Sequence, residues 1–345
     1  MQTTEKQKTD KQNSADTMID VKGLSVNFYT QRGVVKAVRN LSFSIPNGKT
    51  LALVGESGCG KSVTAHSINQ LLPVPPGKIV SGEIWFKGED LLKKSEKEMQ
   101  KIRGEKISMI FQEPMTSLNP VFSVGKQIAD VFLTHHALSK AEAWERAVEL
   151  LNLVKIPSPA KRAESYPHQL SGGMRQRAMI AMALASPDPG LMIADEPTTA
   201  LDVTIQAQIL DLMVSLQQRI GMSLLLITHD MGVVAETADH VVVMYAGRKV
   251  EEGDVFSLFR EPSHPYTLGL MNSLPSNEKY RGAVRLEAIP GTVPDLLSIG
   301  EGCPFMNRCR YATEICGKEF PDETRLSEDH SAWCHNLSAV KESKE

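Results

Sequence analysis

One loop motif constrains the fold of this 345-residue chain more than any other feature. Residues 55–62 read GESGCGKS and fit the pattern G-x-x-x-x-G-K-S/T, in which backbone N–H groups cradle the phosphates of a nucleotide. An apolar run, residues 50–54, precedes the loop, and a helix-compatible stretch follows it. The motif therefore predicts a strand, a phosphate loop and a helix in succession within an α/β fold.

The phosphate loop, residues 55–62, supplies the expected nucleotide contacts. Its glycines let the backbone approach the phosphates, and the following helix presents its positive N-terminal end. Lys61 is expected to neutralise the charge of the β- and γ-phosphates, and the Ser62 hydroxyl to ligate magnesium. The residues predicted to bind nucleotide here are Gly55, Glu56, Ser57, Gly58, Cys59, Gly60, Lys61, Ser62 and Val63.

Two further apolar runs end directly on polar side chains. Residues 191–194 lead into Asp195 and Glu196, and residues 223–228 lead into His229. Continuous apolar runs are typical of parallel strands covered on both faces, and ligands of such sheets lie beyond the carboxyl ends of the strands. We therefore expect these side chains and the phosphate loop to converge on one site.

The polar residues at these strand ends suit ATP hydrolysis. Adjacent side chains of a strand point to opposite sides, so Asp195 can reach magnesium while Glu196 faces the γ-phosphate. Glu196 is expected to polarise the attacking water as a general base, and His229 to contact the γ-phosphate and orient that water. Gln112, which follows an apolar run, carries little signal on its own.

The remaining patterns outline the expected organisation. Residues 19–45 alternate between apolar and polar, which predicts antiparallel strands beside the parallel core. The spacing after Gln112 turns helical, and prolines become frequent after residue 255. We expect a disordered leader (residues 1–16), a core domain (17–255) with an inserted helical subdomain (about 113–190), and a C-terminal extension (256–345).

Charge and hydropathy exclude several classes of protein. The net charge of −3 gives no support for a nucleic-acid-binding surface. No uncharged apolar run approaches the roughly 18 residues of a membrane-spanning helix. Residues 1–16 also lack the apolar segment of a secretory signal. We expect a cytoplasmic chain whose membrane contacts come through partners.

Four of the five cysteines crowd into the C-terminal extension: Cys303, Cys309, Cys316 and Cys334. In a reducing cytoplasm such a cluster indicates metal binding before disulfides. The spacing lacks the paired C-x2-C of structural zinc sites and suits an iron–sulfur cluster in a structural or interfacial role. Zinc stays open, with His330 and His335 as substitute ligands, and so do unligated thiols.

The run LSGGMRQR at residues 170–177 completes a set of motifs that resembles the ATP-binding cassette (ABC) ATPases. From about residue 19 to 253 the chain is similar to the nucleotide-binding domain of an ABC transporter, with every motif present and in order. The resemblance implies a P-loop ABC-type core, made of a parallel sheet, an antiparallel β subdomain and an inserted helical subdomain. A small Cys-rich C-terminal domain follows that core.

The resemblance also implies roles that spacing alone does not. Gln112 would be the Q-loop glutamine, which touches magnesium and water and senses the membrane partner, and His229 the switch histidine. Phe28 or Tyr29 would stack on adenine, with Phe28 the better match to the family pattern. Asp202 ends the D-loop, residues 199–202. The residues that would clamp the γ-phosphate of an ATP bound to the opposite subunit are Ser171, Gly172 and Gly173.

Three C-terminal segments narrow the likeness to the peptide/nickel import subfamily: SHPYT at residues 263–267, RLEAIPG at 285–291, and the four cysteines. Dipeptide and oligopeptide permease ATPases are the nearest likeness, and they imply a 4Fe-4S centre beside ATP and magnesium. The implied partners are a second, distinct ATPase subunit, two transmembrane permease subunits and an extracytoplasmic peptide-binding protein. The chain would lie peripherally on the cytoplasmic face of the inner membrane.

Other functions stay open beside peptide uptake. A nickel, glutathione or other small-solute importer of the same subfamily would use the same motifs. A soluble ABC ATPase of DNA repair or translation is a different class, but the chain has neither a sustained heptad run nor a second phosphate loop. A regulatory module without turnover conflicts with the presence of Glu196.

Overall fold

The computed structural model of the chain describes residues 16–112, 117–186, 189–199, 201–274 and 288–342. These residues fall into two units. Unit 1 contains residues 16–18, 45–49 and the described part of 93–227, and unit 2 contains residues 19–44, 50–92 and the described part of 228–342. Each unit carries part of the residue set expected to handle nucleotide.

Unit 1 contains three parallel strands, β6 (Ile107–Ile110), β7 (Leu191–Asp195) and β8 (Ser223–Thr228). β7 pairs in parallel with both of the others, with Leu191 opposite Ile107 on one side and Ser223 on the other. All residues of β7 and β8 are buried. The strands predicted from the continuous apolar runs at 191–194 and 223–228 are therefore confirmed.

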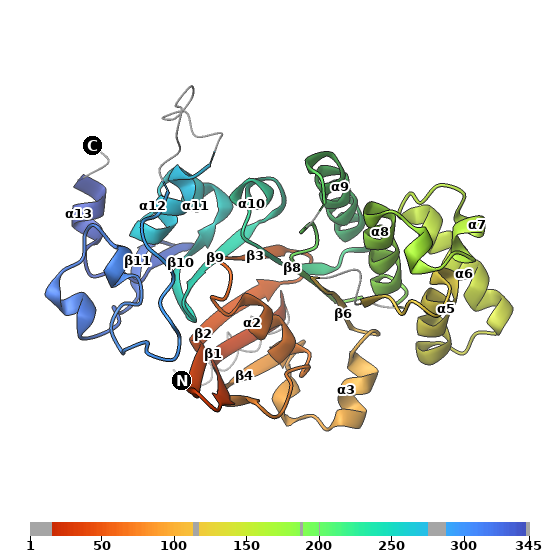
Figure 1. Ribbon diagram of the computed structural model, residues 1–345, viewed down its shortest axis with the longest axis horizontal. Coiled ribbons are helices and arrows are strands. Elements are labelled where there is room, and N and C mark those ends of the chain that lie inside the picture. Colours follow the sequence, from red (N-terminus) through yellow and green to blue (C-terminus); the bar gives the residue numbers. More distant parts are fainter. Residues whose placement is uncertain (1–15, 113–116, 187–188, 200, 275–287, 343–345) are drawn as a thin grey trace, which may run out of the picture. The chain divides into compact units, whose positions relative to one another are not determined.

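The helices of unit 1 follow from their caps and their apolar spacing. Ser139 and Glu142 form a reciprocal capping box at the start of α6, which buries Ala143, Ala147 and Leu151 at four-residue intervals. Figure 1 shows α5, α6 and α7 grouped together in this unit. The helices are α3 (Glu96–Ile102), α5 (Val124–His135), α6 (Lys140–Leu153), α7 (Pro159–Ala163), α8 (Gly172–Ala183) and α9 (Val203–Ile220), with a 3-10 turn η2 (Pro167–Gln169).

The first sheet of unit 2 has the order β2-β1-β4-β5. Its strands are β1 (Thr17–Thr30), β2 (Gly33–Pro46), β4 (Gly77–Phe86) and β5 (Glu89–Asp90). β1 runs antiparallel to β4, from Ile19 opposite Phe86 to Phe28 opposite Gly77. Val21, Leu24 and Val26 are buried, and the register shifts after Lys22. The alternation over residues 19–45 thus predicted the strands β1 and β2 correctly.

Unit 2 also carries β3 (Thr50–Val54), β9 (His240–Tyr245), β10 (Arg248–Asp254), β11 (Thr324–Ser327) and β12 (His330–Ala332). β3 pairs in parallel with β9, whereas the pairs β9–β10, β10–β12 and β12–β11 are antiparallel. The C-terminal strands β11 and β12 therefore join the sheet whose strand β3 leads into the phosphate loop.

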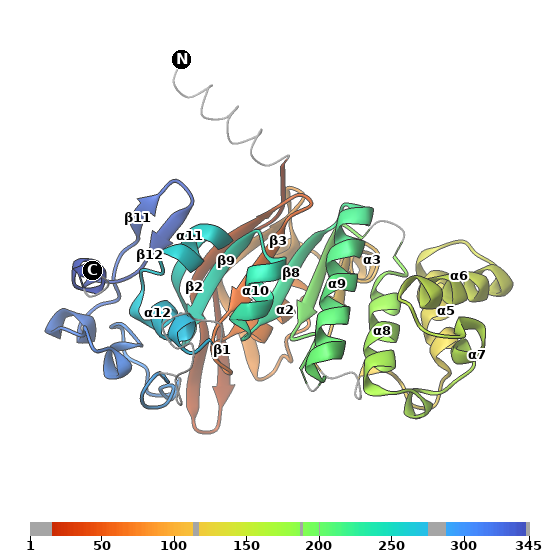
Figure 2. The same cartoon turned by 90° about the horizontal axis from the view of Figure 1, so that it is seen from above.

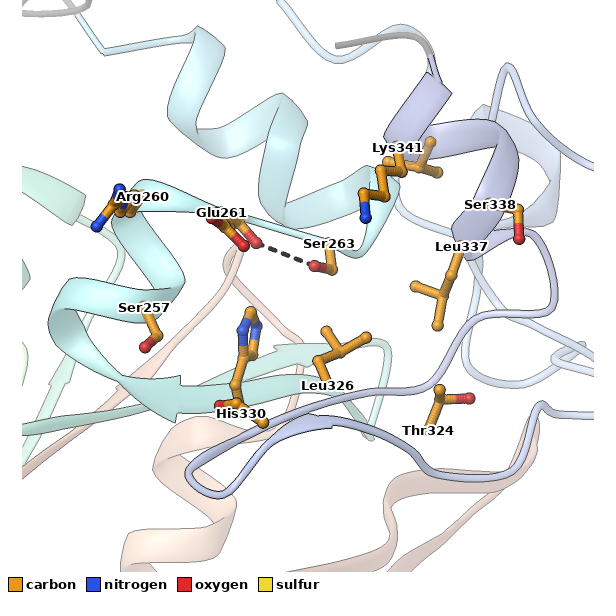
Figure 3. A pocket seen from close by; sticks show the side chains of 12 residues that line it. Ser257, Arg260, Glu261, Ser263, Thr324, Leu326, His330, Leu337, Ser338 and Lys341 are labelled. Atoms are coloured by element: carbon orange, nitrogen blue, oxygen red, sulfur yellow. Dashed lines mark hydrogen bonds between the residues drawn. The ribbon is translucent and has the colours of Figure 1, made fainter. Parts of the chain in front are cut away.

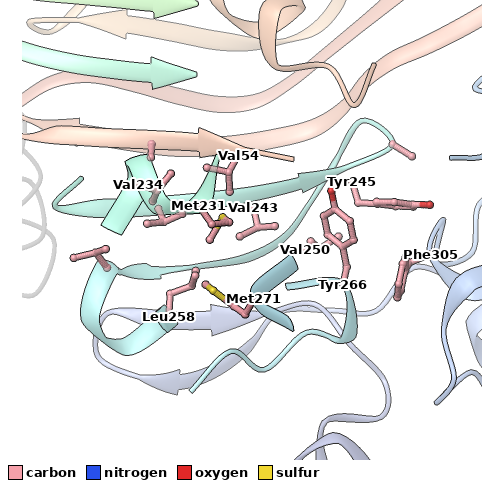
Figure 4. Close-up of a cluster of buried hydrophobic side chains, with 14 residues drawn as sticks. Val54, Met231, Val234, Val243, Tyr245, Val250, Leu258, Tyr266, Met271 and Phe305 are labelled. Atoms are coloured by element: carbon pink, nitrogen blue, oxygen red, sulfur yellow. The ribbon is translucent and has the colours of Figure 1, made fainter. Parts of the chain in front are cut away.

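Three helices of unit 2, α10 (Met231–Thr237), α11 (Val255–Arg260) and α12 (Pro265–Asn272), cover one face of β3, β9 and β10. They contribute Met231, Leu258 and Tyr266 to a buried apolar cluster with Val54 and Val243 (Figure 4). Figure 2 shows the helices along these strands. The helical segments of unit 2 are α2 (Lys61–Ile68), α10 (Met231–Thr237), α11 (Val255–Arg260), α12 (Pro265–Asn272) and α13 (Leu337–Glu342), with 3-10 turns η1 (Leu91–Lys93), η4 (Met306–Arg308) and η5 (Glu314–Gly317).

Some predicted features lie outside the described residues. These are residues 1–15 of the leader, Ala200 of the D-loop and residues 285–287 of the RLEAIPG segment. Residues 256–274 and 288–342 fall in unit 2 together with the phosphate loop, and the boundary near residue 255 stays a prediction. Among the residues that are described, no helix is both long enough and apolar enough to cross a membrane.

Candidate nucleotide site

The phosphate loop of unit 2 needs glycine at two positions. Gly55 has φ +154°, and a Cβ atom there would lie 2.2 Å from the carbonyl oxygen of Met244. Gly60 has φ +105°, and its Cβ would lie 2.5 Å from the carbonyl oxygen of Ala37. Any larger residue would push the loop away from β9 or β2. The loop therefore packs its backbone directly on the sheets beneath it.

Lys61 is the first residue of α2 and is almost fully buried. Its Nζ donates hydrogen bonds to the carbonyl oxygens of Gly55 (2.7 Å) and Glu56 (3.1 Å). The ammonium group thus lies inside the curve of the loop, where backbone N–H groups and the helix N-terminus favour an anion. Burial raises the pKa of the Cys59 thiol, so this neighbour stays neutral and does not add negative charge.

In unit 1 the structure brings Glu196 and Gln112 together. Glu196 follows β7 with φ +45°, a left-handed conformation uncommon for a residue other than glycine. Its N–H donates to the carbonyl oxygen of Ile227 at 2.9 Å. Its Oε2 accepts hydrogen bonds from Gln112 Nε2 (3.0 Å) and Thr199 Oγ1 (2.9 Å). Two hydrogen bonds therefore hold the Glu196 carboxylate at the end of the strand, and a third holds its backbone.

Asp195 and Glu196 differ in burial. Asp195 ends β7 and is 2% exposed, whereas Glu196 is only partly buried. Glu196 lies just beyond the strand in a left-handed conformation, so the opposite facing of the two side chains stays a prediction. A buried carboxylate is stable only with a cation or hydrogen-bond donors beside it, which suits Asp195 to a site that binds a metal ion.

The LSGGMRQR segment begins α8. Ser171 is its N-cap and accepts a hydrogen bond from the N–H of Met174 (3.4 Å). Arg175 Nε donates to the carbonyl oxygens of Pro167 (2.8 Å) and Leu170 (3.0 Å), which fixes the segment before the helix. A Cβ at Gly173 would lie 2.8 Å from Ile205 Cγ2, so this glycine permits close packing of α8 on α9.

The remaining predicted contacts are placed as follows. Asp202 caps α9, where its Oδ1 accepts a hydrogen bond from the N–H of Ile205 (3.0 Å). His229 follows β8 and is exposed. Phe28 packs near Gly77 in the first sheet of unit 2, whereas the side chain of Tyr29 is 50% exposed. The phosphate loop lies in one unit and the carboxylates in the other, so their convergence on one nucleotide stays a prediction.

The four C-terminal cysteines are free thiols, three of them with raised pKa values. Burial, with a smaller contribution from neighbouring cysteines, raises the pKa of Cys303 to about 12 and that of Cys334 to about 11. Asn336 donates to two of the sulfur atoms, from its N–H to Cys334 (3.4 Å) and from Nδ2 to Cys316 (3.5 Å). The cysteines are therefore close neighbours in the fold.

The described residues nevertheless contain no group of three or more His, Cys, Asp or Glu side chains arranged to hold a metal ion. The histidines that could complete a zinc site have other partners. His330 Nε2 lies 2.8 Å from Glu251 Oε1, and His335 Nε2 lies 3.2 Å from the carbonyl oxygen of Glu319. These contacts weaken the case for zinc.

A cavity of about 680 Å³ lies in the C-terminal part of unit 2. Figure 3 shows Arg260 and Lys341 at its edge, with Leu326 and Leu337 beneath Lys341. None of the residues of the nucleotide motifs lines it. This cavity is therefore separate from the candidate nucleotide site.

Two residues that matter to the site escaped sequence reasoning. Thr199 supplies a hydroxyl hydrogen bond to Glu196, and its place three residues downstream could have indicated this contact. Arg308 contacts the phosphate loop through Glu56, 252 residues away in sequence. No local pattern signals such a pair.

Comparison with known proteins agrees with this geometry. Residues 38–199 match the family model described as ABC transporter, and residues 250–316 match the oligopeptide/dipeptide transporter, C-terminal region. The chain is 55% identical over 326 residues to the oligopeptide transport ATP-binding protein OppD of Bacillus subtilis, covering 94% of this chain and 90% of the relative. A probable peptide ABC transporter ATP-binding protein of Sinorhizobium fredii is 53% identical over 326 residues (94% and 97%).

A solved structure gives the same result for the fold. A dimeric ATP-binding cassette in a post-hydrolysis state with ADP and phosphate matches with a TM-score of 0.62 and 28% identity, over 69% of this chain and 99% of that one. The mixed α/β architecture is thus that of an ABC ATPase cassette. The chain belongs to the ATP-binding proteins of ABC transporters, within the class that carries the oligopeptide/dipeptide C-terminal region, as its motifs predicted.

Proposed function

We propose that this chain hydrolyses ATP to power the uptake of dipeptides and oligopeptides through an ABC importer. The observation that carries the proposal is the presence, in one chain, of the ABC cassette and the oligopeptide/dipeptide C-terminal region. Relatives at 53–55% identity over nearly the whole chain are named as peptide or oligopeptide ATP-binding proteins. The class of solute follows from that second region, since the cassette alone fits any ABC transporter.

The phosphate loop binds the triphosphate in this proposal. Gly55 and Gly60 bring the loop backbone close to the sheets, and Lys61 holds its ammonium group within the loop. An incoming phosphate would replace the carbonyl oxygens as the partner of Lys61 Nζ. A charge-assisted bond to phosphate is stronger than one to a neutral carbonyl, so the exchange favours binding.

Glu196 then activates the attacking water. Gln112 and Thr199 hold its carboxylate, which can accept the proton of a water molecule. His229 orients that water against the γ-phosphate. The hydrogen bonds fix the base before substrate arrives, so little reorganisation is needed during the reaction.

Magnesium accompanies ATP in ABC ATPases, and the available side chains fit it. Asp195, Ser62 and the amide oxygen of Gln112 offer the hard oxygen ligands that magnesium prefers. Gln112 uses its amide nitrogen for Glu196, which leaves the oxygen for a cation. When bound, magnesium would offset the charge of the β- and γ-phosphates.

The cassette works in pairs in this proposal. Ser171, Gly172 and Gly173 at the N-terminus of α8 contact the γ-phosphate of the ATP held by a second ATPase subunit, as the dimeric form of the similar cassette supports. Two permease subunits span the membrane, and a binding protein outside it delivers the peptide. The chain itself lies at the cytoplasmic face of the membrane.

We also propose a 4Fe-4S cluster on Cys303, Cys309, Cys316 and Cys334 in the C-terminal extension, residues 256–345. What supports the proposal is that four thiols lie near one another: neighbouring cysteines contribute to the raised pKa values of Cys303 and Cys334, and Asn336 donates hydrogen bonds to two sulfurs. Such a cluster would clip the segment together without a redox step in ATP hydrolysis.

Preparation without oxygen tests the cluster. The protein should be brown, absorb broadly near roughly 400 nm and carry about four iron atoms per chain. A colourless preparation with stoichiometric zinc and no iron would leave a zinc clip instead.

Uptake in cells lacking the gene tests the solute class. Loss of labelled dipeptide and tripeptide uptake, restored by the wild-type chain, supports the proposal when nickel and glutathione uptake are unchanged. Loss of nickel or glutathione uptake with normal peptide uptake would move the chain to another importer of the same subfamily.

A further inference from the structure

The described part of the C-terminal extension, residues 256–274 and 288–342, is called the C-terminal segment. It touches the phosphate loop through Arg308, the last residue of η4. Its side chain is 5% exposed, and the guanidinium donates two hydrogen bonds to the carboxylate of Glu56, from Nη1 to Oε2 (2.5 Å) and from Nη2 to Oε1 (3.0 Å). Glu56 is the second residue of the phosphate loop. A two-pronged arginine–carboxylate pair fixes direction as well as charge, so it holds Glu56 more strictly than a lysine could.

Arg308 is itself held by the C-terminal segment and by β9. Its Nε donates to the carbonyl oxygen of Pro290 (2.8 Å), and its Nη1 lies 3.2 Å from the hydroxyl oxygen of Tyr245. The guanidinium carbon also lies 5.7 Å from the ring centre of Tyr245 and 5.9 Å from that of Phe305. The side chain therefore has one fixed position from which to reach the loop.

A second contact holds the backbone of the same loop residue. The N–H of Glu56 donates to the hydroxyl oxygen of Tyr266 at 2.8 Å. Tyr266 belongs to α12 and is fully buried against Tyr245 and Phe305, with ring centres 4.7 Å and 5.5 Å away. These rings form part of the apolar cluster in Figure 4. Both the backbone and the side chain of Glu56 are thus fixed by residues beyond position 255.

Glu56 carries a negative charge within a loop that must bind a highly charged anion. An unpaired carboxylate there would repel the triphosphate, and it could also bond to Lys61 in the place of a phosphate. Arg308 offsets that charge and draws the carboxylate toward the C-terminal segment. The same contact leaves the loop with a net positive charge from Lys61.

We propose that Arg308 and Tyr266 are positioning residues through which the C-terminal segment sets the affinity of the phosphate loop for nucleotide. Arg308 neutralises and orients the Glu56 side chain, and Tyr266 fixes its backbone. Neither residue contacts the nucleotide itself. The inference rests on the proposed binding of ATP by this loop, and it gives the C-terminal segment a direct part in the ATPase cycle.

The test measures binding of a fluorescent N-methylanthraniloyl ATP, with magnesium, to the full-length chain. Arg308→Leu should raise Kd at least about tenfold, since it exposes the charge of Glu56 to the phosphates. Adding Glu56→Gln to that variant should bring Kd back to within about threefold of wild type, because it removes the repelling charge. The loss should be smaller for the ADP analogue and should shrink as salt is raised.

Two further variants and a control separate charge from folding. Arg308→Lys keeps the charge without the two-pronged geometry and should give an intermediate Kd, and Tyr266→Phe removes only the hydroxyl that holds the loop backbone and should raise Kd about threefold. Arg325→Leu is the control, since the Arg325 side chain donates hydrogen bonds to carbonyl oxygens of its own hairpin, those of Ser327 and Glu328. That variant should bind as wild type does.

Clear outcomes overturn the inference. Binding by Arg308→Leu within twofold of wild type would remove Arg308 from the control of affinity. Failure of Glu56→Gln to restore binding in the Arg308→Leu background would show that charge is not the link. If the wild-type chain bound no ATP analogue at all, the proposed function would fail, which separates the two results.

Discussion

At the scale of single residues, local geometry fixes the orientation of Glu196, the proposed general base. Its left-handed backbone (φ 45°) is unfavourable for a side chain with a Cβ, yet its N–H is satisfied by Ile227 and its carboxylate by Gln112 and Thr199. The contacts of Glu196 thus hold its backbone in a strained conformation, which indicates that the orientation of its side chain matters. We infer that the conformation aims the carboxylate at the attacking water.

Replacing Glu196 by Gln tests this role. The variant should bind ATP but hydrolyse it at least about a hundredfold more slowly, because it loses the general base. Phosphate release and binding of the ATP analogue would be measured side by side. Glu149→Gln, which alters an exposed ion pair with Arg146, is the matched control and should hydrolyse at the wild-type rate. Near-normal turnover in Glu196→Gln would rule out Glu196 as the base.

At the scale of elements, the start of α8 depends on how closely it packs on α9. Two adjacent glycines of the LSGGMRQR segment meet different surroundings there. A Cβ at Gly173 would lie 2.8 Å from Ile205 Cγ2, whereas a Cβ at Gly172 would meet only Leu201 Cδ2 at 3.7 Å. The contact at Gly172 would be an ordinary one, whereas the contact at Gly173 would require the helices to shift.

Alanine substitutions at the two glycines should therefore differ. Gly173→Ala should lower the free energy of unfolding by about 1–2 kcal/mol relative to Gly172→Ala, since overpacking outweighs the gain in helix propensity. Urea unfolding of both variants measures the difference. Equal stability would mean that α8 and α9 are not in close contact at this point.

The start of α12 makes stability depend on pH. His264 caps this helix through Nδ1, which accepts a hydrogen bond from the N–H of Tyr266 (3.1 Å). Burial lowers the pKa of His264 from 6.5 to about 4, although Glu251 opposes the shift. Between these values the unfolded chain takes up a proton that the folded chain does not, so stability falls as pH decreases from 6.5 to 4.

The free energy of unfolding should fall by roughly 3 kcal/mol through His264 by the acid end of that range. His264→Asn keeps an acceptor for the helix cap but cannot titrate, so its stability should fall less steeply over the same range. Urea unfolding at several pH values gives both slopes. Identical slopes in the two proteins would exclude His264 as the titrating group.

At the scale of the whole molecule, local sequence signals predicted the cassette better than the C-terminal segment. The strands at 50–54, 191–194 and 223–228 were predictable because buried parallel strands are continuous apolar runs. The phosphate loop and the LSGGMRQR segment were recognisable because their chemistry is carried by neighbouring residues. The family assignment followed from these motifs and is confirmed.

The C-terminal segment was harder to predict because its structure depends on distant partners. β11 is exposed throughout, and β12 pairs with β10 some 80 residues earlier, so neither strand has a periodic apolar pattern. The carboxylate of Glu251 is fully buried and accepts hydrogen bonds from the N–H groups of Ser263 and His264, with His330 Nε2 2.8 Å away. Such contacts between distant residues leave no local signal.

The central claim is that ATP hydrolysis at Glu196 drives peptide import. The most direct measurement is uptake of a labelled dipeptide by liposomes that hold the complete transporter, with ATP inside and the binding protein outside. The account predicts ATP-dependent accumulation with the wild-type chain and almost none with Glu196→Gln, at equal amounts of assembled transporter. Accumulation that is unchanged by Glu196→Gln, or that proceeds without ATP, would contradict it.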